Sequence, residues 1–302
     1  MKNILFIGGT GLLAINWANQ VKDKYHVFLG THSRFVTLSG VKSVSLKSDL
    51  SELEPFIIEN RIESIINCAG ITSVELCETN PILAFDVNSE LPKKLAIICN
   101  KLNVKLVQIS TDHLFVGDHQ FVSENDLPSP VNIYGKSKLE GEFNVLNQNS
   151  NALVIRTNFF GWGTTYRKSF SDYIITELRN QNEIKLFNDV FYTPILIESL
   201  VNYVTQLMDL NFSGIFNVVS SERMSKYDFG QKIAKAFNLN NHLIKSIQFS
   251  SRLDLITRPL DLSLSNNKLA ISLKMNIESI DDQIRSLVEQ ENKPSYKEII
   301  NL

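Results

Sequence analysis

A glycine-rich turn directly after the first apolar segment constrains the fold more than any other feature of this chain. Residues 4–7 are all apolar, and residues 8–14 read Gly-Gly-Thr-Gly-Leu-Leu-Ala. Gly8 can leave a strand sharply, Gly11 allows a pyrophosphate to come close to the backbone, and Ala14 lets the next helix pack tightly on a sheet. The order of strand, glycine turn and helix therefore predicts a dinucleotide-binding unit at the N-terminus.

The rest of the first half alternates short apolar runs with helix-like segments. Predicted strands cover residues 2–7, 25–29, 44–46, 64–68, 105–109 and 153–156, and predicted helices cover residues 12–22, 51–60, 88–102 and 134–147. Ser51 is expected to cap the second of these helices. Apolar strands alternating with helices are typical of a parallel sheet covered on both faces. We therefore predict an α/β fold, a Rossmann-type doubly wound parallel sheet.

The second half is less regular, and we expect it to form a smaller C-terminal substrate lobe that partly interleaves with the sheet domain. Predicted helices cover residues 170–179, 197–208 and 225–237, a late strand covers 214–219, and 254–268 is loop-like. We assign residues 1–165 to the cofactor-binding domain, with elements near 190–220 rejoining it. Residues 166–302 are assigned mainly to the substrate lobe.

Composition and charge exclude several classes of protein. The 302 residues are 43% hydrophobic and 21% charged, with a net charge of −2, which argues against disorder and against nucleic-acid binding. Cys68, Cys77 and Cys99 form no C-x-x-C pair, so neither a disulfide framework nor a zinc site is expected. No apolar segment has the length of a membrane span or the form of an export signal. We expect a soluble cytoplasmic protein with no metal, membrane or nucleic-acid partner.

The end of the second predicted strand indicates which dinucleotide is bound. An acidic residue there would bond the ribose 2′-hydroxyl, but residues 29–34 contain none. Ser33 and Arg34 can instead hold a 2′-phosphate, which favours NADPH, with NADH as the alternative. Arg34 in a solvated loop remains the other interpretation. Asp49 can accept a hydrogen bond from the adenine amino group, or it can cap the helix that follows.

Two segments carry residues suited to proton transfer. Thr111 follows the predicted strand 105–109, and Tyr134 and Lys138 lie four residues apart on one face of a predicted helix. A nearby ammonium favours the phenolate and lowers the pKa of the tyrosine, so Tyr134 can give a proton to a carbonyl. Thr111 can hydrogen-bond the same oxygen. Such a pair alone is more often a surface contact.

Taken together, these segments resemble a known group of enzymes. The glycine turn, the Ser-Thr-Asp at residues 110–112 and the Tyr-Gly-Lys-Ser-Lys-Leu-Glu-Gly-Glu at residues 134–142 are similar to those of the extended short-chain dehydrogenase/reductase superfamily. Within it, the chain most resembles dTDP-4-dehydrorhamnose reductases and related sugar-nucleotide reductases. The resemblance implies reduction of a nucleotide-linked 4-keto-6-deoxysugar in polysaccharide precursor synthesis, by NADPH, with Thr111, Tyr134 and Lys138 as the catalytic residues. A homodimer is left open.

The resemblance also implies binding residues. Cofactor contacts are expected at Gly8, Gly11, Leu12, Leu13, Ser33, Arg34, Asp49, Leu50, Cys68, Ala69, Gly70, Ile109, Tyr134 and Lys138. Substrate contacts are expected at Asp112, His113, Asn158, Phe159 and Arg258. In relatives the arginine matching Arg258 faces the nucleotide diphosphate, and Asn88 matches an asparagine that supports the fold and a proton relay. Trp162 is expected either in the sugar pocket or in the core, and Glu75 and Glu78 are expected to be solvated.

Three departures from the pattern lie on the substrate side. His113 stands where these reductases have a tyrosine, Phe159 replaces a tryptophan, and Leu260-Asp261 replaces an asparagine and a serine. These departures bear on which sugar is bound and leave the cofactor motifs unchanged. Two alternatives therefore stay open: an epimerase or dehydratase of the same superfamily, and a non-catalytic regulatory subunit that resembles the methionine adenosyltransferase beta subunit.

Overall fold

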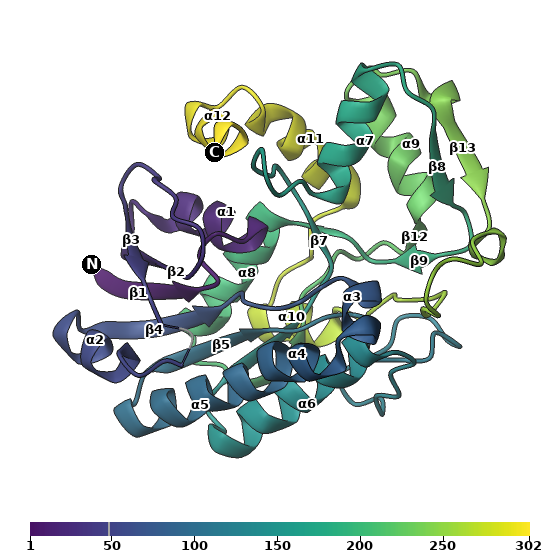
Figure 1. Ribbon diagram of the computed structural model, residues 1–302. Coiled ribbons are helices and arrows are strands. Elements are labelled where there is room, and N and C mark those ends of the chain that lie inside the picture. The colour runs from purple at the N-terminus through teal and green to yellow at the C-terminus, as the bar shows by residue number, and fades with distance from the viewer. Residues whose placement is uncertain (48) are drawn as a thin grey trace.

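The computed structural model describes residues 1–47 and 49–302 and is built around one parallel sheet. Its seven strands lie in the order β3-β2-β1-β4-β5-β6-β11 (Figure 1). Their bounds are β1 Lys2–Ile7, β2 Tyr25–Thr31, β3 Val41–Ser45, β4 Ile62–Asn67, β5 Lys105–Ile109, β6 Leu153–Arg156 and β11 Gly214–Asn217. Every neighbouring pair is parallel, so the predicted doubly wound sheet is confirmed.

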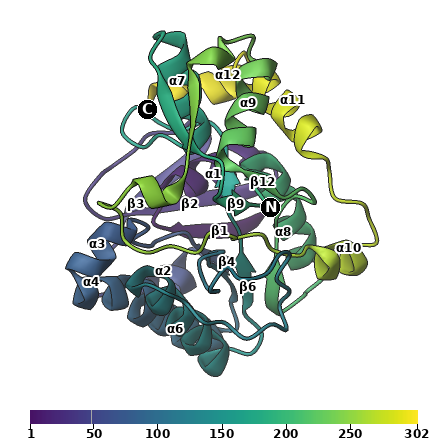
Figure 2. The same cartoon turned by 90° about the vertical axis from the view of Figure 1, so that its right-hand side faces the viewer.

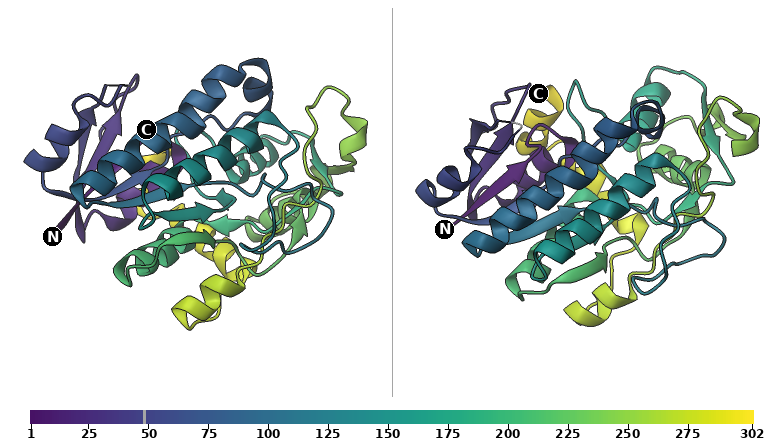
Figure 3. Two further views of the ribbon diagram at one scale, coloured as in Figure 1. Left: turned by 90° about the horizontal axis from the view of Figure 1, so that it is seen from below. Right: turned by 60° about the horizontal axis from the view of Figure 1, so that its bottom comes forward.

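Helices cover both faces of the sheet because the strands are apolar on both sides. Ile4 and Phe6 of β1 belong to one buried cluster, whereas Leu5 and Ile7 belong to another on the opposite face. The first face carries α1 (Leu12–Val21) and α8 (Ile197–Asp209), and the second carries α2 (Leu53–Glu59), α5 (Leu91–Leu102) and α6 (Ile133–Gln148). Figures 1 and 3 show α5 and α6 side by side along the second face.

The remaining elements do not form one layer. They are α3 Val74–Thr79, α4 Pro81–Phe85, η1 Asp86–Glu90, β7 Phe159–Phe160, α7 Phe170–Arg179, β8 Ile184–Phe187, β9 Phe191–Tyr192, β10 Ile195–Leu196, β12 Met224–Ser225, α9 Lys226–Ala236, η2 Asn241–Leu243, β13 Ile244–Ile247, η3 Phe249–Ser251, α10 Asn267–Leu273, α11 Ile280–Gln290 and α12 Pro294–Asn301. Helices α7 and α9 lie with β8 and β13 beyond the carboxyl ends of the strands, whereas α12 packs on α1, and α10 packs on β11 and α8 (Figures 1 and 2). Three two-stranded sheets, β10-β7, β12-β9 and β13-β8, join segments that are distant in sequence. The division of the chain at residue 165 stays a prediction.

Several predicted boundaries are wrong, mainly where local contacts decide them. Ser51 does not cap α2: its amide and hydroxyl both donate to Asp49 Oδ1, at 2.9 and 2.8 Å, and the helix starts at Leu53. The strand expected at residues 44–46 spans Val41–Ser45, and the one expected at 214–219 ends at Asn217.

The helix expected at residues 88–102 is interrupted in its first turn. Residues Asp86–Glu90 form a π-helical turn, and regular α-helix begins only at Leu91, with a proline in its first turn. Such insertions are frequent at functional sites, where they re-aim a side chain. Among the helices of the described residues, none is long and apolar enough to cross a membrane.

Candidate active site

A cleft of about 870 Å³ opens at the carboxyl ends of β1, β4 and β5. A second hollow of about 540 Å³ adjoins it, and Gly8, Thr10, Ser33 and Ala69 line both. The order of the strands reverses between β1 and β4, and ligands of doubly wound sheets bind at this point. The two hollows together are therefore the candidate site.

The glycine turn forms the floor of the cleft. Gly8 has φ +75°, and a Cβ there would lie 2.7 Å from the Ala69 amide nitrogen, so a side chain is excluded on both counts. Gly11 caps α1, and among the described residues no side chain accepts a hydrogen bond from the first amides of that helix, since Asn16 donates to the Leu12 carbonyl instead. The first amides of α1, at Leu12 and Leu13, therefore remain available to a phosphate at the cleft wall.

The other predicted cofactor residues divide into two groups. Ser33, Arg34, Cys68, Gly70 and Ile109 line the main cleft, and Leu50 lines the adjoining hollow. Asp49 lines neither; it is exposed and accepts the two hydrogen bonds from Ser51. Its Oδ1 therefore serves the local turn, and the adenine contact expected for it stays a prediction.

Thr111, Tyr134 and Lys138 line the same wall of the cleft. Their exposed fractions are 3, 7 and 6%, so all three are buried where a ligand would meet them. The Lys138 ammonium donates to the Ile109 carbonyl at 2.6 Å, which fixes it against the end of β5. Gly135 lets the start of α6 pack closely against the loop after β5, because a Cβ there would lie 2.4 Å from the His113 carbonyl.

The pKa values of this trio differ from the expectation. Burial raises the pKa of Tyr134, and the Thr111 hydroxyl opposes this shift. Burial lowers the pKa of Lys138 to about 8, opposed by the Glu142 carboxylate. The predicted lowering of the Tyr134 pKa by Lys138 is therefore wrong for this structure, because desolvation dominates the shift and Lys138 is not among the groups that act on Tyr134.

The predicted substrate residues next to the trio also line the cleft. Asp112 is buried, and its Oδ2 accepts a hydrogen bond from Asn158 at 2.6 Å. His113 lies beside Tyr134, with 5.4 Å between the ring centroids, and burial lowers its pKa. Phe159 completes this end of the cleft.

Arg258 does not line the cleft. Its guanidinium donates instead to the Glu75 carboxylate on α3, from a loop 183 residues away in sequence. The neighbouring Glu78 accepts a hydrogen bond from the Ile133 amide at 2.7 Å, at the start of α6. Both acids were expected to be solvated. The Glu75 side chain stays 44% exposed while it pairs with Arg258, and Glu78 is partly buried with its carboxylate at the start of α6.

Sequence patterns missed several residues of the cleft. Thr10, Thr72, Thr157, Tyr166, Arg167, Lys168 and Phe170 also line it. Periodicity gives no signal for them, since most belong to turns. Trp162 does not line the cleft: it is buried and its indole nitrogen donates to the Leu287 carbonyl at 2.9 Å, so it belongs to the core.

Asn88 sits in the π-helical turn behind the trio. Its side-chain amide donates to the Ile71 carbonyl at 3.0 Å and to the Ser137 hydroxyl at 3.1 Å, and its Oδ1 accepts from the Ile71 amide. Ser137 lies between Tyr134 and Lys138 on α6. Asn88 therefore ties the helix of the trio to the loop that follows β4.

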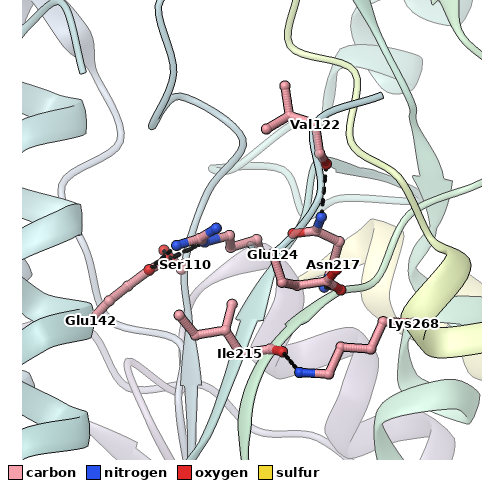
Figure 4. A network of polar contacts seen from close by, with 8 residues as sticks. Ser110, Val122, Glu124, Glu142, Ile215, Asn217 and Lys268 are labelled. Carbon is pink, nitrogen blue, oxygen red and sulfur yellow. Dashed lines mark hydrogen bonds and ion pairs between the residues drawn. The ribbon is translucent and has the colours of Figure 1, made fainter. Parts of the chain in front are cut away.

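A buried ion pair fixes the strand ends below the cleft. Arg156 donates to both oxygens of Glu142, at 2.7 Å from Nη2 and 3.0 Å from Nε, and Ser110 also donates to Glu142. Figure 4 shows Glu142 and Ser110 facing each other, and Asn217 pointing to the Val122 carbonyl, at 3.0 Å. The network therefore joins β5, β6 and α6.

Within the described residues, no group of three acidic, histidine or cysteine side chains is placed to hold a metal.

The parallel sheet, the glycine turn and the buried Thr-Tyr-Lys trio define a class of protein, the short-chain dehydrogenase/reductase type. The chain belongs to the RmlD substrate binding domain family, which matches residues 1–293. The expected group is therefore confirmed.

Two sequence relatives and two solved structures illustrate this kinship. The probable low-salt glycan biosynthesis reductase Agl14 of Haloferax volcanii is 31% identical over 79% of this chain and 81% of its own. Methionine adenosyltransferase 2 subunit beta of Xenopus laevis is 27% identical over 80% of this chain and 74% of its own.

A hypothetical dTDP-4-dehydrorhamnose reductase of Sulfolobus tokodaii superimposes with a TM-score of 0.80 at 30% identity, over 93% of this chain and 98% of that one. The dTDP-4-dehydrorhamnose reductase of Bacillus anthracis, solved in complex with NADP, gives a TM-score of 0.85 at 22% identity, over 96% of this chain and 100% of that one. These relatives agree with the predicted class of sugar-nucleotide reductases.

Proposed function

We propose that this protein uses NADPH to reduce a nucleotide-linked 4-keto-6-deoxysugar, as a dTDP-4-dehydrorhamnose reductase does. The observation that carries the proposal is that one cleft joins the glycine turn to Thr111, Tyr134 and Lys138. A dinucleotide site and a proton donor for a carbonyl thus lie in a single hollow. The name of the Sulfolobus tokodaii relative supports the same substrate class, and the name of Agl14 supports a reductase of glycan biosynthesis.

In the proposed reduction, Tyr134, Thr111 and Lys138 would each have a separate role. The bound nicotinamide supplies a hydride to the carbonyl carbon of the substrate. Tyr134 gives its phenolic proton to the carbonyl oxygen, and its raised pKa means that this proton is present at neutral pH. Thr111 donates a hydrogen bond to the same oxygen. Lys138 is positively charged below about pH 8 and stabilises the phenolate that the transfer leaves behind.

Substrate and cofactor would occupy different parts of the cleft. Asp112, held by Asn158, can accept hydrogen bonds from sugar hydroxyls, and His113 borders the same place. The buried His113 Nδ1 and Thr157 Oγ1 have no partner among the described residues, as expected of polar atoms that await a ligand.

At the other end, Ser33 and Arg34 would hold the 2′-phosphate that distinguishes NADPH from NADH. Arg258 remains a candidate for the nucleotide diphosphate only if the ligand displaces Glu75. Cytoplasmic location and a homodimer stay predictions.

The experiment that tests this proposal follows NADPH absorbance with purified protein and a panel of nucleotide-linked 4-keto-6-deoxysugars. Loss of NADPH that depends on the sugar and is stoichiometric with product is expected. An epimerase or a dehydratase would convert its substrate without net loss of NADPH. Measurable NADPH binding with no conversion of any member would contradict the proposal.

A regulatory role is the second candidate, because the methionine adenosyltransferase 2 beta subunit matches four-fifths of the chain. The trio is intact, which favours chemistry, but a fold of this kind can also serve as a binding module. Copurification from the native host distinguishes the two. A stoichiometric complex with a methionine adenosyltransferase catalytic subunit, together with no turnover of any sugar, would replace the first proposal by the second.

A further inference from the structure

A tight turn at residues 163–168, here called the Tyr166 turn, lies beside the glycine turn. Thr164 and Arg167 exchange two backbone hydrogen bonds, at 3.1 and 3.3 Å, which close the turn. Its base is anchored, because the Gly163 amide donates to Asp172 of α7 at 2.7 Å. The Asn16 side chain of α1 also donates to the carbonyl of Trp162, just before the turn, at 2.8 Å. The Tyr166 turn is therefore held by both the sheet domain and the smaller lobe.

Tyr166 at the tip makes two contacts across the cleft. Its hydroxyl donates to the Thr10 carbonyl in the glycine turn at 3.2 Å. Its ring lies under the guanidinium of Arg34, whose Cζ is 4.0 Å from the ring centroid. Tyr166 is half-buried, whereas Arg34 is exposed in the loop after β2. An anchored aromatic ring thus supports a cation from an exposed loop.

Arg34 needs such support if it is to select a cofactor. Among the described residues it has no carboxylate partner, and a free arginine side chain spreads over many rotamers. Stacking on Tyr166 keeps the guanidinium at the cleft wall that Ser33 and Arg34 share. A planar guanidinium held there is preorganised for a phosphate, so less entropy is lost on binding.

We infer that Tyr166 is a positioning residue that makes the site prefer NADPH to NADH, by holding Arg34 where the 2′-phosphate binds. This inference rests on the proposed cofactor use, and it adds a specificity determinant from a segment distant in sequence. The Tyr166 side chain would then have two roles, one for its hydroxyl at Thr10 and one for its ring under Arg34. Loss of the Thr10 contact would disturb the glycine turn and weaken both dinucleotides, whereas loss of the ring would weaken only the one that carries the extra phosphate.

The test measures dissociation constants of NADPH and NADH by titration calorimetry on Tyr166→Leu and Tyr166→Phe. Tyr166→Leu removes the ring, so NADPH affinity should fall about two- to five-fold relative to NADH, the range of an exposed cation–π contact. Tyr166→Phe keeps the ring and loses only the hydroxyl, so the ratio of the two constants should stay as in the wild type. Tyr173→Leu, an exposed tyrosine of α7 outside the cleft, is the matched control.

A double-mutant cycle with Arg34→Ala completes the test. Arg34→Ala should weaken NADPH about tenfold or more, and adding Tyr166→Leu to it should leave the NADPH-to-NADH ratio unchanged. The inference is overturned if Tyr166→Leu weakens both dinucleotides equally, if it leaves their ratio unchanged, or if its effect persists without Arg34. Equal wild-type affinities for NADPH and NADH would overturn it while leaving the reductase proposal intact. A wild-type protein that binds neither would overturn both.

Discussion

The two ends of the cleft are built in different ways. The cofactor end comes from successive strand–turn–helix units, where Gly8 meets Ala69 and the start of α1 is left open. The substrate end joins segments that are more distant in sequence, since Asn158 bonds Asp112 across 46 residues. Arg258 lies outside the cleft lining but acts on His113, and it pairs with Glu75 across 183 residues. Sequence patterns brought the first group of residues together and did not predict the Arg258–Glu75 pair. A short motif predicts local backbone geometry. The contact partner of a loop residue depends instead on the tertiary fold, which a short motif does not encode.

The largest expected effect concerns Tyr134, where the two ends meet. Tyr134→Phe removes the proton donor but keeps the ring, so kcat should fall about 100- to 10,000-fold while the dissociation constant of NADPH stays within about twofold. Steady-state kinetics and calorimetry measure the two quantities. Tyr173→Phe, outside the cleft, should leave both unchanged. Near-normal turnover of Tyr134→Phe would contradict the assignment.

The next effect tests the buried ion pair of Arg156 and Glu142 behind the strand ends of the cleft. Glu142→Ala leaves Arg156 buried without its carboxylate, so the free energy of unfolding should fall by about 3–5 kcal/mol. The exposed pair of Arg252 and Asp254 in the loop near the substrate end supplies the comparison. Asp254→Ala should cost less than about 1 kcal/mol. Urea unfolding measures both, and similar losses for the two variants would refute the contrast.

A third prediction asks whether Arg258 leaves Glu75 to bind substrate. If it does, Arg258→Ala should raise KM for the nucleotide sugar about tenfold or more, because a charge-assisted hydrogen bond to a phosphate is lost, while NADPH affinity is unchanged. Arg252→Ala, a neighbouring exposed arginine, is the control. An unchanged KM would leave Arg258 with only its contact to α3.

The smallest expected effect is the change in kcat/KM as Lys138 loses its proton above neutral pH. Its pKa is lowered to about 8, so it is charged at pH 7 and loses its proton as the pH rises through about 8. The value of kcat/KM should therefore fall above pH 8 with the loss of one proton. Lys138→Arg stays charged, so its residual activity should show no such decline. A flat wild-type profile from pH 7 to 9 would argue against a required ammonium.

The sequence predicted most of the main sheet and helices α7, α8 and α9, but it did not predict the C-terminal helices α10, α11 and α12. Helix α7 has the predicted bounds, and the helix predicted over residues 225–237 spans Lys226–Ala236, with Ser225 as its cap and Asp228 completing a capping box. The two-residue strands β7, β9, β10 and β12 were missed, since their pairing is set by segments distant in sequence. The π-helical turn at Asn88 was read as ordinary helix because apolar spacing does not reveal a single extra residue per turn.

In the site, as in the fold, residues placed by local motifs were predicted better than residues placed by distant contacts. Every glycine-turn and strand-end residue predicted for the cofactor lines one of the two hollows except Asp49, whose local hydrogen bonds to Ser51 compete with a ligand. Tyr166 could not be found from its neighbours, because its role depends on Arg34 and Thr10, more than 130 residues earlier. The shift of the Tyr134 pKa was predicted with the wrong sign because burial cannot be read from a spacing.

The most direct test of the central claim is transfer of hydrogen from the cofactor to the sugar. The protein would be incubated with NADPH deuterated at both positions of nicotinamide carbon 4 and with a nucleotide-linked 4-keto-6-deoxysugar, and the product analysed by mass spectrometry and NMR. The account predicts a reduced sugar with one deuterium on its carbon 4 and one NADP formed per product. A product without deuterium, or conversion of the sugar with no NADPH consumed, would contradict it.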